Sequence, residues 1–128
     1  MKKFILFAVL IWGPLVWLAQ FLVPDTIPMT VTAYCLCEQC CGEWACETKR
    51  VTSIGDDAHI CDGVAADPKL IPYRTRLWIP GVGEREVDDT GGRMRQDAKK
   101  GIWHIDLRME SHEAARAWGI QKLDVTIL

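Results

Sequence analysis

Three aspartates stand where short apolar stretches meet turns, and a carboxyl group in such a place can do acid–base chemistry. They are Asp67 in Ala-Asp-Pro, Asp89 in Asp-Thr-Gly-Gly and Asp106 in Ile-Asp-Leu. Apolar neighbours keep water away from a carboxyl group, which raises its pKa and lets it act as a general acid near neutral pH. Asp67 and Asp89 also have a simpler explanation, because Asp side chains commonly cap turns.

Asp106 is the strongest candidate for such an acid. Side chains point to alternate faces of an extended strand, so Ile105 and Leu107 share one face while His104, Asp106 and Arg108 share the other. We therefore expect Asp106 to be partly desolvated. His104 beside it is either a group that tunes Asp106, a substrate contact or an ordinary surface histidine.

The cysteines are a second group of residues that could do chemistry. The six are Cys35, Cys37, Cys40, Cys41, Cys46 and Cys61. In an exported chain an even number of cysteines indicates disulfides first. The spacing of Cys37 and Cys40 is also that of zinc ligands, and a redox pair is the third alternative. Zinc at this cluster is the one cofactor that the sequence leaves possible, and no other cofactor is expected.

The elements that must position these residues are short. Alternation and β-branched residues predict strands, Asp-Pro and glycine-rich stretches predict the turns between them, and Ser111 is a good N-cap for one short helix ending at Trp118. Residues 35–63 are expected to form a Cys-rich ordered loop and residues 93–101 a charged loop. The predicted strands span 29–34, 75–79, 84–88, 102–108 and 124–128, and residues 64–66 form a further short apolar stretch. Many short strands with one helix predict a mainly β fold, a small β-barrel.

The N-terminal sequence contains a long apolar segment. Lys2 and Lys3 precede residues 4–23, which carry no charge and are long enough to span a bilayer as a helix. We therefore expect a signal anchor or transmembrane helix at 1–24 that enters the inner membrane, followed by an exported domain at 25–128. A cleaved signal peptide, and hence secretion, is the alternative. Without the two lysines the net charge changes from −2 to −4, which gives no indication of nucleic acid as a partner.

Six motifs occur in order along the chain: Val-Thr-Ala-Tyr at 31–34, Ala-Ala-Asp-Pro-Lys-Leu-Ile-Pro at 65–72, Asp-Asp-Thr-Gly-Gly at 88–92, Ile-Asp-Leu at 105–107, Ser-His-Glu-Ala-Ala at 111–115 and Trp-Gly at 118–119. This ordered set resembles the 3D domain family, which is named for three aspartates and is similar to the catalytic domain of membrane-bound lytic transglycosylase A. Cysteine-rich members with a stretch like that at 34–42 are also similar. The segment between the glycine turn and Asp106 is longer and more basic here than in the family.

This resemblance implies a six-stranded double-psi β-barrel in the bacterial cell envelope. It also implies cleavage of the β-1,4 bond between N-acetylmuramic acid and N-acetylglucosamine in peptidoglycan glycan strands, the expected partner. Asp106 would be the acid and base of a lytic transglycosylase, Asp89 would support it, and Asp67 would be the more structural of the three. Thr32, Tyr34, Thr90 and His104 are the expected substrate contacts.

Aromatic side chains add one further candidate, because sugars bind to aromatic faces. Trp103 shares a strand face with Ile105 and is expected in the core, and Trp118 is expected to pack on the barrel. Trp44 in the Cys-rich loop is therefore the best platform for a sugar. Two other functions stay open: a non-catalytic, expansin-like glycan-binding module, and a Cys-rich metal or redox module.

Overall fold

A computed structural model describes residues 25–45 and 50–128. The helices and strands are short, as expected. They are β1 (Asp25–Tyr34), α2 (Glu38–Cys41), the 3-10 helix η1 (Gly42–Trp44), β2 (Gly63–Ala65), β3 (Arg76–Ile79), β4 (Gly83–Asp89), α3 (Gly92–Lys99), β5 (His104–Arg108), α4 (His112–Trp118) and β6 (Gln121–Ile127).

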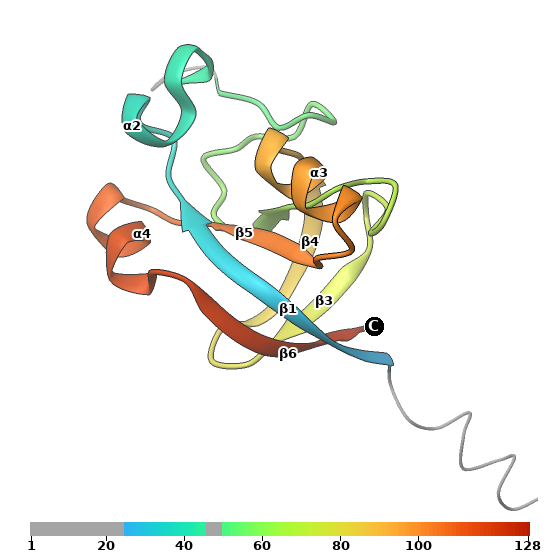
Figure 1. Cartoon of the computed structure of the whole chain (residues 1–128). Coiled ribbons are helices and arrows are strands. Elements are labelled where there is room, and N and C mark those ends of the chain that lie inside the picture. Colours follow the sequence, from blue (N-terminus) through green and yellow to red (C-terminus); the bar gives the residue numbers. More distant parts are fainter. Residues whose placement is uncertain (1–24, 46–49) are drawn as a thin grey trace, which may run out of the picture.

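Six strands of the described chain close into a barrel in the order β1-β5-β2-β4-β3-β6 (Figure 1). β1 runs parallel to β5 and β2 runs parallel to β4, while the remaining neighbours are antiparallel. The predicted mainly β barrel and its five predicted strands are therefore confirmed. The sixth strand, β2, lies in the short apolar stretch around 64–66. The largest differences are that β1 begins at Asp25 and β6 at Gln121, several residues earlier than expected.

The inside of the barrel is a single apolar core. It is formed by Met29, Val31, Val64, Ala66, Ile71, Leu77, Ile79, Val87, Ile105, Leu107 and Val125. The alternation predicted for β5 is confirmed, because Ile105 and Leu107 belong to this core. Trp103 and Trp118 pack against it, as expected, and the Trp118 indole N–H also donates to the Val31 carbonyl at 3.0 Å.

The outer face of β5 is covered as well, and this corrects two expectations. Residues 92–99 form the helix α3, which lies against β5, where a charged loop was predicted (Figure 1). Only Met94 and Asp97 of α3 are buried. One of these two inward residues is charged, so the segment lacks the apolar periodicity by which helices are recognised. The barrel consequently carries several short helices instead of one.

The other predicted helix is confirmed. α4 begins after Ser111, whose Oγ accepts a hydrogen bond from the Ala114 N–H at 3.1 Å, and it ends before Gly119. The Cys-rich segment 35–63, predicted to be a loop, contains the single-turn helices α2 and η1. Gly42, with φ of 56°, separates these two turns in a conformation that glycine adopts without strain.

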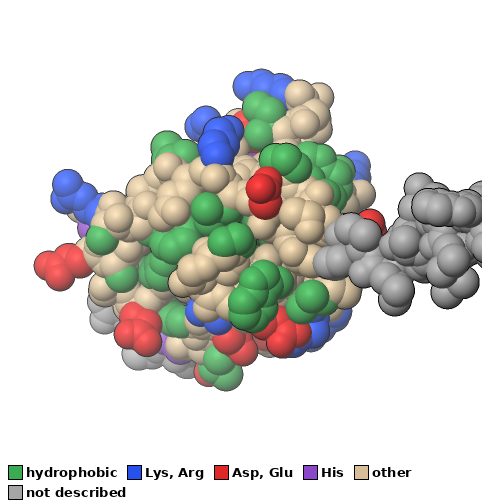
Figure 2. Space-filling view, turned by 90° about the horizontal axis from the view of Figure 1, so that it is seen from below, with side chains coloured by type: hydrophobic (Ala, Val, Ile, Leu, Met, Phe, Trp, Pro, Cys, Tyr) green, Lys and Arg blue, Asp and Glu red, His purple; other side chains and the backbone are tan. Residues whose placement is uncertain are grey.

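The predicted N-terminal anchor lies outside the described residues. Within 25–45 and 50–128, no helix is long and apolar enough to cross a membrane. Seen from below, the barrel presents apolar side chains among acidic and basic ones (Figure 2). That face therefore carries charges of both signs and is not a uniformly basic surface of the kind that binds nucleic acid.

Candidate active site

The strand register places the site residues in one row across the outer face of the barrel. Thr32 of β1 is paired with Asp106 of β5, and Asp106 is paired with Ala65 of β2. Ala65 is in turn paired with Asp89 of β4, after a register shift at Val64. Four neighbouring strands thus bring Thr32, Asp106 and Asp89 together, although they are far apart in the sequence.

A chain of hydrogen bonds leads from Asp106 into the protein. The Thr32 Oγ1 lies 3.0 Å from Asp106 Oδ1 and 2.7 Å from His104 Nε2. On its other side, His104 Nδ1 lies 2.7 Å from Asp97 Oδ2. The chain therefore runs Asp97–His104–Thr32–Asp106, and its third and fourth members are the only ones that are not fully buried.

Two proton arrangements satisfy this chain with the same number of protons. In one, ionised Asp106 accepts from the Thr32 hydroxyl, and both His104 nitrogens donate, to Thr32 and to Asp97. In the other, protonated Asp106 donates to the Thr32 oxygen, the Thr32 hydroxyl donates to His104, and His104 donates only to Asp97. The shift of one proton from Thr32 to Asp106 and of a second from His104 to Thr32 connects the two states. The geometry can thus move a proton between Asp106 and His104.

The environment of Asp106 favours its protonated form. Burial raises the pKa of Asp106 to about 6, the Thr32 hydrogen bond opposes this effect, and the negative charge of nearby Asp89 adds to it. In contrast, the hydrogen bond from His104 lowers the pKa of Asp97. At the inner end of the hydrogen-bond chain, Asp97 therefore favours the carboxylate form. At the outer end, Asp106 holds its proton to a higher pH than an ordinary carboxyl group.

Asp89 is buried and is held as a hydrogen-bond acceptor. Its Oδ2 accepts from the Tyr34 hydroxyl at 2.9 Å. Its Oδ1 accepts from the Ser53 N–H at 3.1 Å, the Ser53 hydroxyl at 2.6 Å and the Thr90 N–H at 2.9 Å. Burial and the charge of Asp89 raise the pKa of Tyr34, so that Tyr34 stays a donor. Four donors fix one carboxylate next to the Asp106 carboxyl group.

A buried ion pair between Arg108 and Asp88 lies beside Tyr34. Arg108 binds Asp88 through both terminal nitrogens, at 2.9 and 2.6 Å, and donates to the Tyr34 oxygen at 3.2 Å. The Arg108 side chain is fully buried and that of Asp88 nearly so. Gly63 makes this possible, because a Cβ at position 63 would overlap the Asp88 carboxylate oxygens.

Two surface depressions flank this row of residues. One, of about 420 Å³, is lined by Asp106, His104 and Thr32 together with the cationic side chains of Arg93, Lys100 and Lys122. The other, of about 570 Å³, is lined by Asp89, Thr90 and Trp44, among others. Both volumes lie in the usual range for small-ligand sites, roughly 300–1,000 Å³.

The remaining predicted contacts fall into two groups. Trp44 is 69% exposed and is available to a ligand. The Thr90 hydroxyl oxygen is buried and has no hydrogen-bond partner in the described part of the chain. Asp67 lines neither depression. Its Oδ1 accepts from the Lys69 N–H at 3.1 Å and its carbonyl from the Ile71 N–H at 2.8 Å, the bonding expected of a turn residue.

The cysteine cluster differs from the disulfide framework that was expected. Cys35, Cys37, Cys40, Cys41 and Cys61 are all free, while Cys46 lies outside the described residues. Instead, Cys35, Cys37 and Cys40 gather around the imidazole of His112 at the start of α4, and the four ligand atoms lie within 4.8 Å of one another. This group could hold a metal ion.

Several residues of the site lie outside the sequence predictions. Asp97 falls in the segment that was expected to form a charged loop, and no pattern in the sequence indicates its contact with His104. Ser53 sits in an irregular segment that gives no pattern. His112 is 72 residues from Cys40, and no metal-ligand spacing in the sequence connects the two.

Comparison with known proteins agrees with these features. The family model of the 3D domain matches residues 62–128, which include β2 to β6 and the turns with Asp67 and Asp89. The cell wall-binding protein YocH of Bacillus subtilis (strain 168) is 31% identical over 65 residues, which are 51% of this chain and 21% of that protein. The chain thus matches about a fifth of the length of this relative. This chain belongs to the 3D domain family.

Proposed function

We propose that this protein cleaves the glycan strands of peptidoglycan, as a lytic transglycosylase with Asp106 as its acid and base. The observation that carries this proposal is a carboxyl group with a pKa of about 6 that lines an open depression beside a second, fully hydrogen-bonded carboxylate. A proton donor of this kind next to a fixed negative charge suits the formation of an oxocarbenium-like transition state.

In this reaction protonated Asp106 gives its proton to the glycosidic oxygen, and the bond from this oxygen to C1 of the muramic acid breaks. The Asp106 carboxylate then takes the proton of the C6 hydroxyl group, whose oxygen bonds to C1. The products are a shortened strand and a 1,6-anhydro sugar, no water is consumed, and Asp106 is protonated again. Asp89 stabilises the positive charge that develops on the sugar.

The hydrogen-bond chain positions Asp106 during this cycle. While Asp106 is ionised, Thr32 can donate its hydroxyl hydrogen to the carboxylate, and His104 lies between Thr32 and Asp97. His104 and Asp97 are thus positioning residues that act through Thr32. The predicted substrate contact His104 takes this role here because it is buried and its two nitrogens are both occupied.

Substrate charge also fits the surface around the site. Peptidoglycan carries carboxylates on its peptide stems, and Arg93, Lys100 and Lys122 border the Asp106 depression. Exposed Trp44 borders the Asp89 depression and offers an aromatic face to a sugar ring. We infer that the glycan strand runs from one depression to the other, across the row of Asp106 and Asp89.

Mass spectrometry of muropeptides tests this function. The full chain, purified in mild detergent, is incubated with purified peptidoglycan, alongside Asp106→Asn and the turn variant Asp67→Asn. We expect anhydromuropeptides from the wild type and from Asp67→Asn, with a loss of at least about 100-fold for Asp106→Asn. Products with reducing ends would mean hydrolysis instead. Equal release by Asp106→Asn would remove Asp106 from the mechanism.

A second function rests on the printed name of the relative, a cell wall-binding protein. In that case the two depressions bind the glycan without cutting it. Pelleting of the folded protein with peptidoglycan, with no released fragment at any pH from 4 to 8, would establish binding and sink the enzymatic proposal. Under either function we place the protein in the bacterial cell envelope.

The type of barrel and the N-terminal anchor are also part of the proposal. We infer that the two parallel strand pairs, β1 with β5 and β2 with β4, are those of a double-psi barrel. The barrel domain at 25–128 and the anchor at 1–24 remain predictions from the sequence. Protease protection of the full chain in inverted membrane vesicles tests the anchor.

A further inference from the structure

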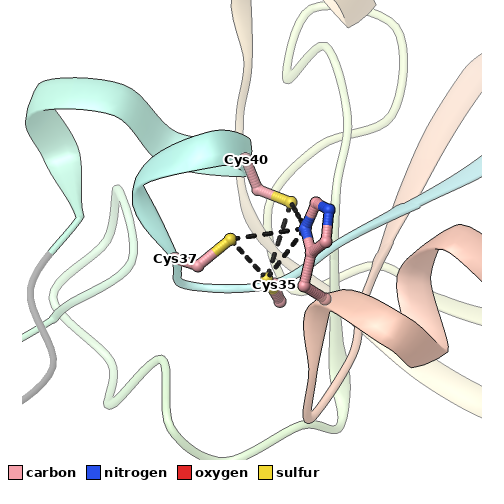
Figure 3. Close-up of side chains that lie close together, drawn as sticks. Cys35, Cys37 and Cys40 are labelled. Carbon is pink, nitrogen blue, oxygen red and sulfur yellow. Dashed lines mark hydrogen bonds between the residues drawn. The ribbon is translucent and has the colours of Figure 1, made fainter.

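We propose that Cys35, Cys37, Cys40 and His112 bind one zinc ion with a structural role. The sulfurs of Cys35, Cys37 and Cys40 point toward a common centre (Figure 3). The Nδ1 atom of His112 lies 3.4 Å from the Cys37 sulfur, 3.5 Å from that of Cys40 and 4.0 Å from that of Cys35. A histidine nitrogen facing three sulfurs is the arrangement of a Cys₃His metal site.

The distances fit a tetrahedral zinc ion. With zinc bonds of about 2.3 Å to sulfur and about 2.0 Å to nitrogen, the edges of the tetrahedron are about 3.8 Å between sulfurs and about 3.5 Å between sulfur and nitrogen. The Cys35 sulfur lies 3.5 Å from that of Cys40 and 3.0 Å from that of Cys37. Binding of the ion therefore requires changes of no more than about 1 Å in the separations of the ligand atoms.

The local backbone holds the ligands in place. The N–H groups of Cys40 and Cys41 donate to the Cys37 carbonyl at 3.1 and 2.9 Å, so the chain turns back and Cys40 lies over Cys37. His112 is the first residue of α4, which Ser111 caps. Two segments that are over seventy residues apart thus supply a preformed ligand set.

The chemistry of the donors selects the ion and its role. Thiolate and imidazole ligands favour zinc over magnesium or calcium, which prefer oxygen. Four protein ligands fill all positions of a tetrahedral ion, and such closed sites are structural, whereas catalytic zinc keeps a position open. Cys41 stays outside the set, because its sulfur lies 3.1 Å from the Cys35 carbonyl oxygen, as a donor to it.

The site joins the strands that carry the candidate active site. Cys35 directly follows Tyr34 at the end of β1, and His112 follows Arg108 at the end of β5 by four residues. Tyr34 and Arg108 are register partners, and the Met109 N–H donates to the Tyr34 carbonyl at 2.7 Å. Zinc would thus fasten the two strand ends and the segment that leads to Trp44. Any effect on glycan cleavage rests on the proposed function.

Metal analysis of the full chain tests the site without reference to activity. The protein is produced in zinc-containing medium, purified in detergent without chelators, and measured by plasma mass spectrometry together with thiol counting. We expect one zinc ion per chain for the wild type and for Cys41→Ser and Cys61→Ser, which change neighbouring cysteines outside the set. Cys37→Ser and His112→Ala are expected to contain less than about a tenth as much.

A second variant separates metal binding from general damage to the fold. His112→Cys offers a fourth thiolate and should retain zinc, and its cobalt-substituted form should show the visible bands of a tetrahedral thiolate site, as should the wild type. A folded wild-type chain without zinc, or a disulfide between any two of the three cysteines in the protein isolated from the envelope, would overturn the proposal. Equal zinc content in His112→Ala and the wild type would also overturn it.

Discussion

Thr32 is the hydrogen-bond link between His104 and the Asp106 carboxyl group, with its hydroxyl oxygen 3.0 Å from Asp106 Oδ1. Because a hydroxyl group has one hydrogen and can both donate and accept, Thr32 can reverse the direction of the whole chain. This property distinguishes it from a group that only packs beside the acid.

Replacement of Thr32 by valine keeps the shape and removes the hydroxyl group. The Thr32 hydrogen bond lowers the pKa of Asp106, so its loss should move that pKa upward from about 6. Activity that needs protonated Asp106 should then persist to higher pH, while kcat falls about tenfold or more because the link to His104 is broken. The measurement is the rate of anhydromuropeptide release between pH 4 and 8.

Thr126→Val is the matched control, since Thr126 lies on β6 and its hydroxyl shares a hydrogen bond with that of the exposed Thr26. It should change neither the rate nor the pH profile. If Thr32→Val loses stability but its pH profile coincides with that of the wild type, then Thr32 is a packing residue and not part of a proton path.

Removing the charge of Asp106 should stabilise the protein at neutral pH. The folded-state pKa is raised above the unfolded value of about 3.9, so the native state binds the extra proton, and stability is lost as the pH rises from about 4 to 6. Two pKa units correspond to about 3 kcal/mol. Asp106→Asn should therefore melt several degrees above the wild type at pH 7.5 and at nearly the same temperature at pH 4.

Scanning calorimetry at the two pH values measures this difference. The exposed Asp124→Asn is the control and should shift the melting temperature by less than about 1 °C at either pH. A lower melting temperature for Asp106→Asn at pH 7.5 would mean that the Asp106 charge is stabilised by its surroundings, contrary to its burial.

Much of the site could be predicted because it depends on local pattern. Alternation along β5 identified Asp106 and the buried Ile105 and Leu107, and the glycine turn identified Asp89. Asp97 and His112 could not be found in this way. Each meets its partner only through the packing of a helix on the barrel, and such long-range contacts leave no periodic trace in the sequence.

The cysteines illustrate a different difficulty. Exported chains use cysteines mostly in disulfides, so composition favoured cross-links, and the spacing of Cys37 and Cys40 alone left zinc as the weaker alternative. The distinguishing fact is the position of His112, which the fold of the closed barrel determines by bringing the end of β5 beside the end of β1.

Tyr34→Phe should destabilise the fold and release Asp89. The hydroxyl group donates to Asp89 and accepts from Arg108, and both partners are buried. Leaving buried polar groups unpaired costs about 1–3 kcal/mol. The expected result is a lower urea midpoint than for Tyr73→Phe, whose ring also packs against the core but has no such partners among the described residues. Coincident unfolding curves for the two variants would contradict the role of Tyr34.

Gly63→Ala should be among the most damaging of small substitutions. The added methyl group would occupy the place of the Asp88 carboxylate oxygens and separate them from Arg108, whose side chain is completely buried. Disrupting a buried ion pair costs about 3–5 kcal/mol, which in a domain of this size lowers the melting temperature by about 10 °C or more. Gly92→Ala is the matched control, because no atom lies within 4 Å of its new methyl group and alanine favours the helix α3. Melting curves followed by circular dichroism compare the two. Melting temperatures within about 2 °C of each other would mean that Asp88 can move without leaving Arg108, and that the pair does not hold β2 in place beside Asp106.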